Sequence, residues 1–161
     1  MPFPEPGDLI PSFSAAATQG QNFTEYSLQG QITVLYFYPK DDTPGCTTEG
    51  QDFRDHQADF VAQGAQIIGV SRDSLTSHEK FCTKYALPFP LIADTEETLC
   101  QMFEVLKEKN MYGRMVMGVE RSTFLIGPDG RLARAWRKVK VEGHGMEVLE
   151  AVKALRQEGT V

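Results

Sequence analysis

Two runs of apolar residues dominate the pattern of the first half of the chain. The run Ile32 to Tyr38 is rich in β-branched and aromatic residues and ends at Pro39. A second run, residues 65–71, follows a segment with helical spacing. Continuous apolar runs of this length are typical of strands that are covered on both faces. The order strand, helix, strand therefore predicts a parallel pair joined by a right-handed crossover.

The segment between these strands is predicted to be one long helix, residues 46–63, which Gly64 ends. Its apolar positions are Phe53, Phe60 and Val61, at near-helical spacing.

A second helix is predicted to open at residues 73–79, where Thr76 and Glu79 have the spacing of a capping box. It contains Cys82 and ends before Leu87-Pro88, because the residue before a proline disfavours helical geometry.

The remaining helices and strands are shorter. Residues 90–93 are a short apolar strand, and a helix begins at 94–97 and continues to Phe103. Residues 145–157 carry apolar side chains on one face, which predicts a terminal helix.

Two hairpins are predicted, over residues 14–24 and 122–136, because turn-forming residues separate apolar segments in both. Residues 107–119 show neither period, and we expect an irregular connection there.

These elements predict an α/β fold with a central mixed sheet flanked by helices, preceded by an N-terminal hairpin. A thioredoxin-like fold fits this pattern, and a flavodoxin-like sheet competes with it. At 161 residues the chain is most simply a single domain over residues 1–161 with a sizeable core.

Charge and composition exclude several classes of function. The net charge of -6 and the pI near 5.1 argue against an electrostatic grip on nucleic acid or an anionic membrane. No apolar run is long enough to span a bilayer, and the first residues do not resemble a signal peptide. Three cysteines fit redox or catalytic use better than a disulfide framework, which predicts a cytoplasmic protein.

Cys46 stands at the predicted junction of strand, loop and helix, which is a reactive place for a thiol. Unpaired backbone N–H groups and the helix dipole favour the thiolate there, and the thiolate is the nucleophile. Attack on a peroxide would also need polar groups beside the sulfur. Thr43 offers a hydroxyl, Pro39 would form a wall without an N–H, and Gly45 would let the turn come close.

Pro39, Thr43 and Cys46 form the pattern Pro-x-x-x-Thr-x-x-Cys, which resembles the signature of the peroxiredoxins. The fuller string from Tyr38 to Thr47 is similar to that of the peroxiredoxin Q group, also called bacterioferritin comigratory protein. Further matching stretches are residues 69–71, 89–94 and 121–126. The resemblance covers nearly the whole chain and favours the thioredoxin-like fold over the flavodoxin-like one.

The resemblance implies that Arg121 reaches Cys46 and the bound peroxide. A guanidinium there would stabilise the thiolate and then the charge on the leaving oxygen. The alternative is a surface arginine paired with Glu120 or another acid. Glu49 also matches a frequent family residue, and its plainer role is an acid that favours the helix dipole.

The resemblance also bears on the second thiol. Many members carry a resolving cysteine five residues after the first, where this chain has Gln51. Another group carries it on a later helix, and Cys82 falls at that place. Cys100 competes for the role, although a buried, unreactive thiol is the usual outcome in its apolar surroundings. A mechanism that uses Cys46 alone and an external thiol also remains open.

The implied function is reduction of hydrogen peroxide or organic hydroperoxides by Cys46, with a Cys46–Cys82 disulfide recycled by thioredoxin or a similar dithiol protein. The resemblance implies no metal, haem or flavin cofactor, and it favours a monomer because the resolving cysteine is internal. The alternatives are a redox-sensing or holdase-like interaction module and a thiol-disulfide oxidoreductase. The latter needs a Cys-x-x-Cys pair, and Glu49 occupies its second position. The three histidines do not have the spacing of metal ligands.

Overall fold

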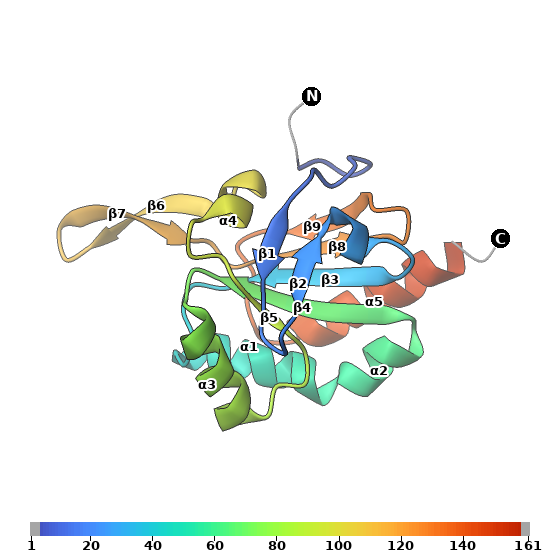
Figure 1. Ribbon diagram of the computed structural model, residues 1–161, viewed down its shortest axis with the longest axis horizontal. Coiled ribbons are helices and arrows are strands. Elements are labelled where there is room, and N and C mark those ends of the chain that lie inside the picture. The colour runs from blue at the N-terminus through green and yellow to red at the C-terminus, as the bar shows by residue number, and fades with distance from the viewer. Residues whose placement is uncertain (1–3, 159–161) are drawn as a thin grey trace.

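The structure, a computed structural model, describes residues 4–158 and is built around a five-stranded sheet in the order β5-β4-β3-β8-β9 (Figure 1). The middle strand β3 (Ile32–Phe37) pairs parallel with β4 (Ala65–Ser71) and antiparallel with β8 (Ser122–Ile126). The two edges are β5 (Leu91–Ala93), parallel to β4, and β9 (Leu132–Trp136), antiparallel to β8. The sheet is therefore mixed, as the sequence predicts.

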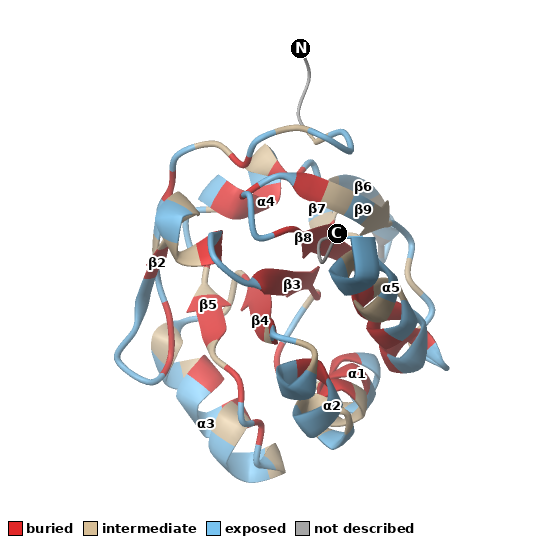
Figure 2. Cartoon of the chain, turned by 90° about the vertical axis from the view of Figure 1, so that its right-hand side faces the viewer, coloured by how far each residue is buried: buried red, intermediate tan, exposed pale blue. Residues whose placement is uncertain are grey.

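Helices cover both faces of this sheet (Figure 2). On one face lie α1 (Pro44–Asp55), α2 (Gln57–Ala62), α3 (Leu75–Tyr85) and α5 (His144–Glu158). On the other face lies the short helix α4 (Thr98–Met102). No helix in residues 4–158 is long and apolar enough to cross a membrane.

The predicted N-terminal hairpin is present. Strands β1 (Ser14–Ala16) and β2 (Asn22–Thr24) pair antiparallel, and the 3-10 helix η1 (Glu25–Leu28) follows. The hairpin is fastened to the edge strand β5, because the backbone N–H of Thr18 donates to the carbonyl of Leu91 at 3.0 Å.

Successive side chains of β3 point to opposite faces and divide the core in two. Val34 and Tyr36 belong to the apolar cluster beneath α1, α2, α3 and α5. Leu35 and Phe37 belong to the cluster on the α4 face. All four side chains are at most 1% exposed, and burying an aromatic or aliphatic side chain contributes roughly 1.5–3 kcal/mol. Each face is therefore a core of its own.

The prediction of an irregular connection at residues 107–119 is wrong. Strands β6 (Leu106–Met111) and β7 (Arg114–Val119) form an antiparallel hairpin that projects from the body of the molecule (Figure 1). Its two-residue turn places Tyr112 and Gly113 at φ 55° and 80°, a geometry that favours glycine and disfavours tyrosine. The side chain of Asn110 stabilises the turn by accepting from the N–H of Gly113 at 3.1 Å.

Two helix predictions also need correction. The single helix predicted over residues 46–63 is interrupted at His56, which caps both α1 and α2, and Val61 is 58% exposed. The N-cap of α3 is Ser74, whose hydroxyl accepts from the N–H of Ser77 at 3.2 Å. The predicted capping box one turn into this helix is therefore absent.

Candidate active site

Cys46 lies in the first turn of α1 and is 2% exposed. Thr43 is the N-cap residue, in extended geometry, and Pro44 occupies the first helical position, where its fixed φ suits the turn. The first intrahelical bond runs from the N–H of Thr47 to the carbonyl of Thr43 at 2.8 Å. Cys46 therefore lies among the N–H groups that a helix leaves without an intrahelical partner, at the positive end of its dipole.

Arg121 lies beside this thiol, and its Nη2 donates to Sγ of Cys46 at 3.4 Å. The register of β3 and β8 brings it there, because Phe37 pairs with Ser122 and Arg121 precedes that residue. A Cβ atom on Gly45 would lie only 3.0 Å from Nη2 of Arg121. The missing side chain therefore lets the guanidinium approach the sulfur.

Glu49 holds the other arm of the guanidinium. Nη1 of Arg121 donates to Oε1 of Glu49 at 2.5 Å, and the two side chains are 15% and 1% exposed. Burial raises the pKa of Glu49 to about 7, against the opposing effect of the Arg121 charge. Its Oε2 has no hydrogen-bond partner among the described residues. The alternative for Arg121, a surface arginine paired with Glu120 or another acid, does not match this geometry, because Arg121 is largely buried and its acidic partner Glu49 is fully buried.

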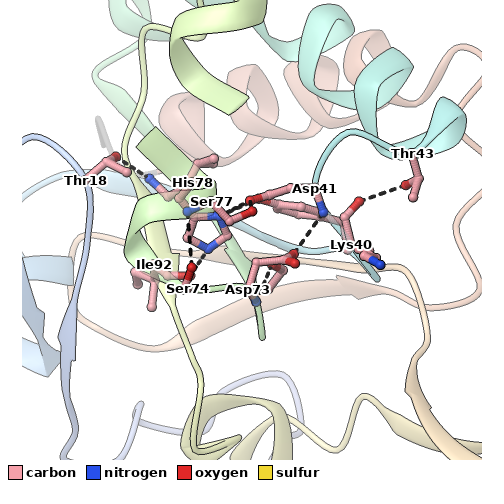
Figure 3. A network of polar contacts seen from close by, with 12 residues as sticks. Thr18, Lys40, Asp41, Thr43, Asp73, Ser74, Ser77, His78 and Ile92 are labelled. Atoms are coloured by element: carbon pink, nitrogen blue, oxygen red, sulfur yellow. Dashed lines mark hydrogen bonds and ion pairs between the residues drawn. The ribbon is translucent and has the colours of Figure 1, made fainter. Parts of the chain in front are cut away.

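Thr43 and Pro39 lie in the loop between β3 and α1, residues 38–43. The hydroxyl of Thr43 donates to the carbonyl of Lys40 at 2.7 Å (Figure 3). Because its one proton is used there, the oxygen remains an acceptor for an incoming O–H group. Pro39 is half-buried at the start of the loop and carries no N–H.

Comparison with known proteins decides the family. The profile of the AhpC/TSA family matches residues 6–135. The chain belongs to this family. Peroxiredoxin Bcp of Xanthomonas campestris is 58% identical over 125 residues, 78% of each chain, and Peroxiredoxin Bcp of Bacillus subtilis is 46% identical over 153 residues, 95% of this chain and 98% of that one.

Solved structures agree with this assignment. Peroxiredoxin Q of Xanthomonas campestris superposes with a TM-score of 0.86 at 52% identity, covering 89% of this chain and 91% of the other. A mutant PrxQ of Xylella fastidiosa gives 0.88 at 45% identity, covering 93% and 96%. The predicted peroxiredoxin Q group and its thioredoxin-like fold are thereby confirmed. The protein is a thiol-dependent peroxidase.

The two other thiols of this peroxiredoxin lie on different faces of the sheet. Cys82, in the last turn of α3, is half-buried and packs against the cluster that contains Cys46. Burial raises the pKa of Cys82 to about 11. Cys100 is fully buried in the cluster on the α4 face, where burial and a hydrogen bond with Asp94 raise its pKa further. All three thiols are free.

A buried polar network lies next to the active-site loop of the peroxiredoxin, and the sequence analysis missed it (Figure 3). Oδ2 of Asp41 accepts from the hydroxyl of Ser77 at 2.8 Å and lies 2.7 Å from Nδ1 of His78. Oδ1 of Asp41 accepts from the hydroxyl of Tyr38 at 2.6 Å. Nε2 of His78 lies 2.9 Å from the carbonyl of Ile92, which can only accept, so this nitrogen carries a proton. The one sequence signal is the pair of aspartates before the thiol, and it does not indicate their partners.

The same network contains the one group of possible metal ligands found among residues 4–158. Ligand atoms of Asp41, Asp73 and His78 lie within 4.8 Å of one another. Oδ2 of Asp73 accepts from the hydroxyl of Ser71 at 2.6 Å and from the N–H of Asp41 at 2.8 Å. Because these oxygens are already bound by protein donors, the group functions as a hydrogen-bond network in this structure.

Proposed function

We propose that the thiolate of Cys46 attacks one oxygen of hydrogen peroxide or an alkyl hydroperoxide. The S–O bond forms as the O–O bond breaks, which leaves Cys46 as a sulfenic acid and releases water or an alcohol. The contact of 3.4 Å between Nη2 of Arg121 and Sγ of Cys46 carries this proposal. Alkyl hydroperoxides are included because a bacterioferritin comigratory protein of Xanthomonas campestris has been described in terms of its alkyl peroxide reduction activity.

The neighbouring residues stabilise the charges of the reaction and orient the peroxide. Arg121 stabilises the thiolate and then the negative charge that grows on the leaving oxygen. Glu49 orients Arg121 through the hydrogen bond to Nη1. The oxygen of Thr43 accepts the peroxide O–H and turns the attacked oxygen toward the sulfur, while Pro39 closes the site without offering a competing donor.

Cys82 then condenses with the sulfenic acid of Cys46 to give a disulfide and water. Its position on the same face of the sheet supports this role over Cys100, which the sheet separates from Cys46. Two solved structures of the Xanthomonas campestris protein each carry one cysteine-to-serine substitution, and the two substituted positions are 36 residues apart. Cys82 follows Cys46 by the same interval. Thioredoxin or a similar dithiol protein reduces the disulfide, and no second subunit is needed, in keeping with a cytoplasmic monomer.

Peroxide consumption by Cys46→Ser tests the proposal. A hydroxyl of similar size is hardly ionised near neutral pH, so turnover should be lost while the fold is kept. Cys100→Ser is the matched control and should keep its activity. Activity of Cys46→Ser within a few-fold of the parent would overturn the assignment of Cys46.

The disulfide is tested by mass spectrometry of peroxide-treated protein that is digested without reductant. The expected product joins the peptides of Cys46 and Cys82. A Cys46–Cys100 peptide would refute the role of Cys82. Complete turnover by Cys82→Ser with an external thiol, at the parent rate, would favour the mechanism that uses Cys46 alone.

A further inference from the structure

Helix α3 is tied at both ends to the loop that precedes Cys46. Near the start of the helix, the buried carboxylate of Asp41 binds Ser77 and His78. In the last turn, the exposed carboxylate of Asp42 accepts from Nζ of Lys84 at 2.8 Å and from the hydroxyl of Tyr85 at 2.7 Å. Two consecutive residues of the active-site loop therefore hold the two ends of one helix.

Cys82 lies between these two points of attachment. It follows His78 by one helical turn and precedes Lys84 by two residues. Its carbonyl accepts from the N–H groups of Ala86 and Leu87, which close the end of the helix. Movement of Cys82 therefore requires this last turn to open.

Such movement is needed if Cys82 is to resolve Cys46. A disulfide requires Cα atoms within about 7 Å and side chains that point toward each other, whereas the thiol of Cys82 hydrogen-bonds with Thr18 of the N-terminal hairpin. Here the two cysteines lie on separate intact helices and neither is bonded. Burial also raises the pKa of Cys82 to about 11, so its thiol is hardly ionised while α3 remains packed.

We propose that Asp41 and Asp42 form a latch that holds α3 against the active-site loop and sets the rate at which Cys82 reaches the sulfenic acid of Cys46. This inference rests on the proposed function. Two reactions compete for the sulfenic acid. In one, it condenses with the Cys82 thiol to give the disulfide and water; in the other, it reacts with a second hydrogen peroxide to give a sulfinic acid and water. Asp41 and Asp42 are positioning residues, and the latch sets the ratio of the two products.

The outer half of the latch, Asp42 with Lys84 and Tyr85, is the part that directly restrains the turn of Cys82. Lys84 and Asp42 are exposed, so their contact is modest in strength and its removal leaves the core intact. The inner half, at Asp41, is buried and fixes the first turn of α3. Opening at the end that carries Cys82 can therefore precede release of the whole helix.

The double variant Lys84→Met/Tyr85→Phe tests the outer half, because it removes both donors to Asp42 and keeps both side chains close to their size. Three quantities are measured in rapid-mixing experiments: oxidation of Cys46 by hydrogen peroxide, formation of the disulfide, and the sulfinic fraction as peroxide is raised. We expect unchanged oxidation of Cys46, disulfide formation faster by about threefold to tenfold, and a sulfinic fraction reduced by the same ratio.

Two further variants serve as controls. Glu150→Gln removes an exposed ion pair with Lys153 on α5, far in sequence from the latch, and should match the parent in all three quantities. Asp42→Asn weakens the same contacts by changing the loop residue instead of the helix residues. Asparagine tolerates the positive φ of 58° at this position. Combined with the double variant it should give little further acceleration, because both changes remove the same contacts.

Two results would distinguish a failure of the latch proposal from a failure of the proposed function. If Cys46 is oxidised normally but the disulfide rate and the sulfinic fraction equal those of the parent, the latch is wrong and the proposed function stands. If peroxide does not oxidise Cys46 in the parent, the proposed function itself fails. Equal acceleration by Glu150→Gln would also overturn the latch, since the effect would then reflect general loss of stability.

Discussion

Replacing Glu49 by glutamine tests the electrostatic balance of the active site. The carboxyl group is 1% exposed, one oxygen accepts from Arg121 at 2.5 Å, and the other has no partner among the described residues. Glutamine has nearly the same size and can still accept from the guanidinium, but it does not titrate. Glu49→Gln therefore removes one proton-binding group and leaves the packing in place.

The size of the effect follows from the pKa of Glu49, which burial raises from 4.5 to about 7. Between these two pH values the folded protein holds a proton that the unfolded chain has released, so the stability of the parent falls as pH rises through this window. At about 1.4 kcal/mol for each pH unit, the full loss is on the order of 3 kcal/mol. The variant lacks this loss and should become more stable relative to the parent as pH rises.

Urea unfolding of both proteins at pH 4.5, 6, 7 and 8, with reductant present to keep the cysteines as thiols, measures the difference. We expect the stability of Glu49→Gln minus that of the parent to increase through this series and to level off above pH 7. A difference that stays constant would show that Glu49 does not titrate in this range. A difference that decreases would show that the Arg121 charge outweighs burial.

Two further predictions concern the surroundings of Cys46, and a third concerns Cys100. Arg121→Lys should lower the second-order rate with peroxide by ~10²-fold in stopped flow, because the planar guanidinium reaches Glu49 and the sulfur with two separate nitrogens, whereas lysine has a single nitrogen; an unchanged rate would make Arg121 structural. Gly45→Ala should slow the same step about tenfold, since its Cβ would lie 3.0 Å from the guanidinium, and a rate equal to that of the parent would show that the arginine adjusts freely. Cys100→Ser should form the usual disulfide while losing about 1–3 kcal/mol in urea unfolding, because a hydroxyl replaces a fully buried thiol; loss of the disulfide would contradict the separation of the two sheet faces.

The parts of the fold that could be predicted are those in which the local pattern and the tertiary environment agree. The strands around Leu35 and Ile68 are buried on both faces, and their continuous apolar runs indicate this directly. The hairpin of β6 and β7 could not be predicted in this way. Its β7 residues are largely exposed, so their side chains do not alternate, and Tyr112 stands at a turn position that usually carries asparagine or glycine.

The active site shows the same division. Cys46 and Thr43 are neighbours in sequence, so the strand-loop-helix junction could be predicted from spacing alone. The place of Arg121 beside the thiol follows from the family resemblance and not from the local pattern, because it depends on the register between β3 and β8. The contact between Asp41 and His78 joins residues 37 positions apart. It depends on how α3 packs against the loop, and no local sequence pattern predicts that packing.

The contact between Arg121 and Cys46 spans 75 residues, and this has a consequence for the newly synthesised chain. The arginine is held in place by the pairing of β8 with β3, so the thiol emerges from the ribosome long before its partner exists. At about 5–20 residues per second, synthesis of the intervening segment takes about 4–15 s. During that interval Cys46 lacks the guanidinium that contacts its sulfur in the folded protein. Under the proposed function, this cysteine therefore reaches its full reactivity toward peroxide only after β8 has paired with β3.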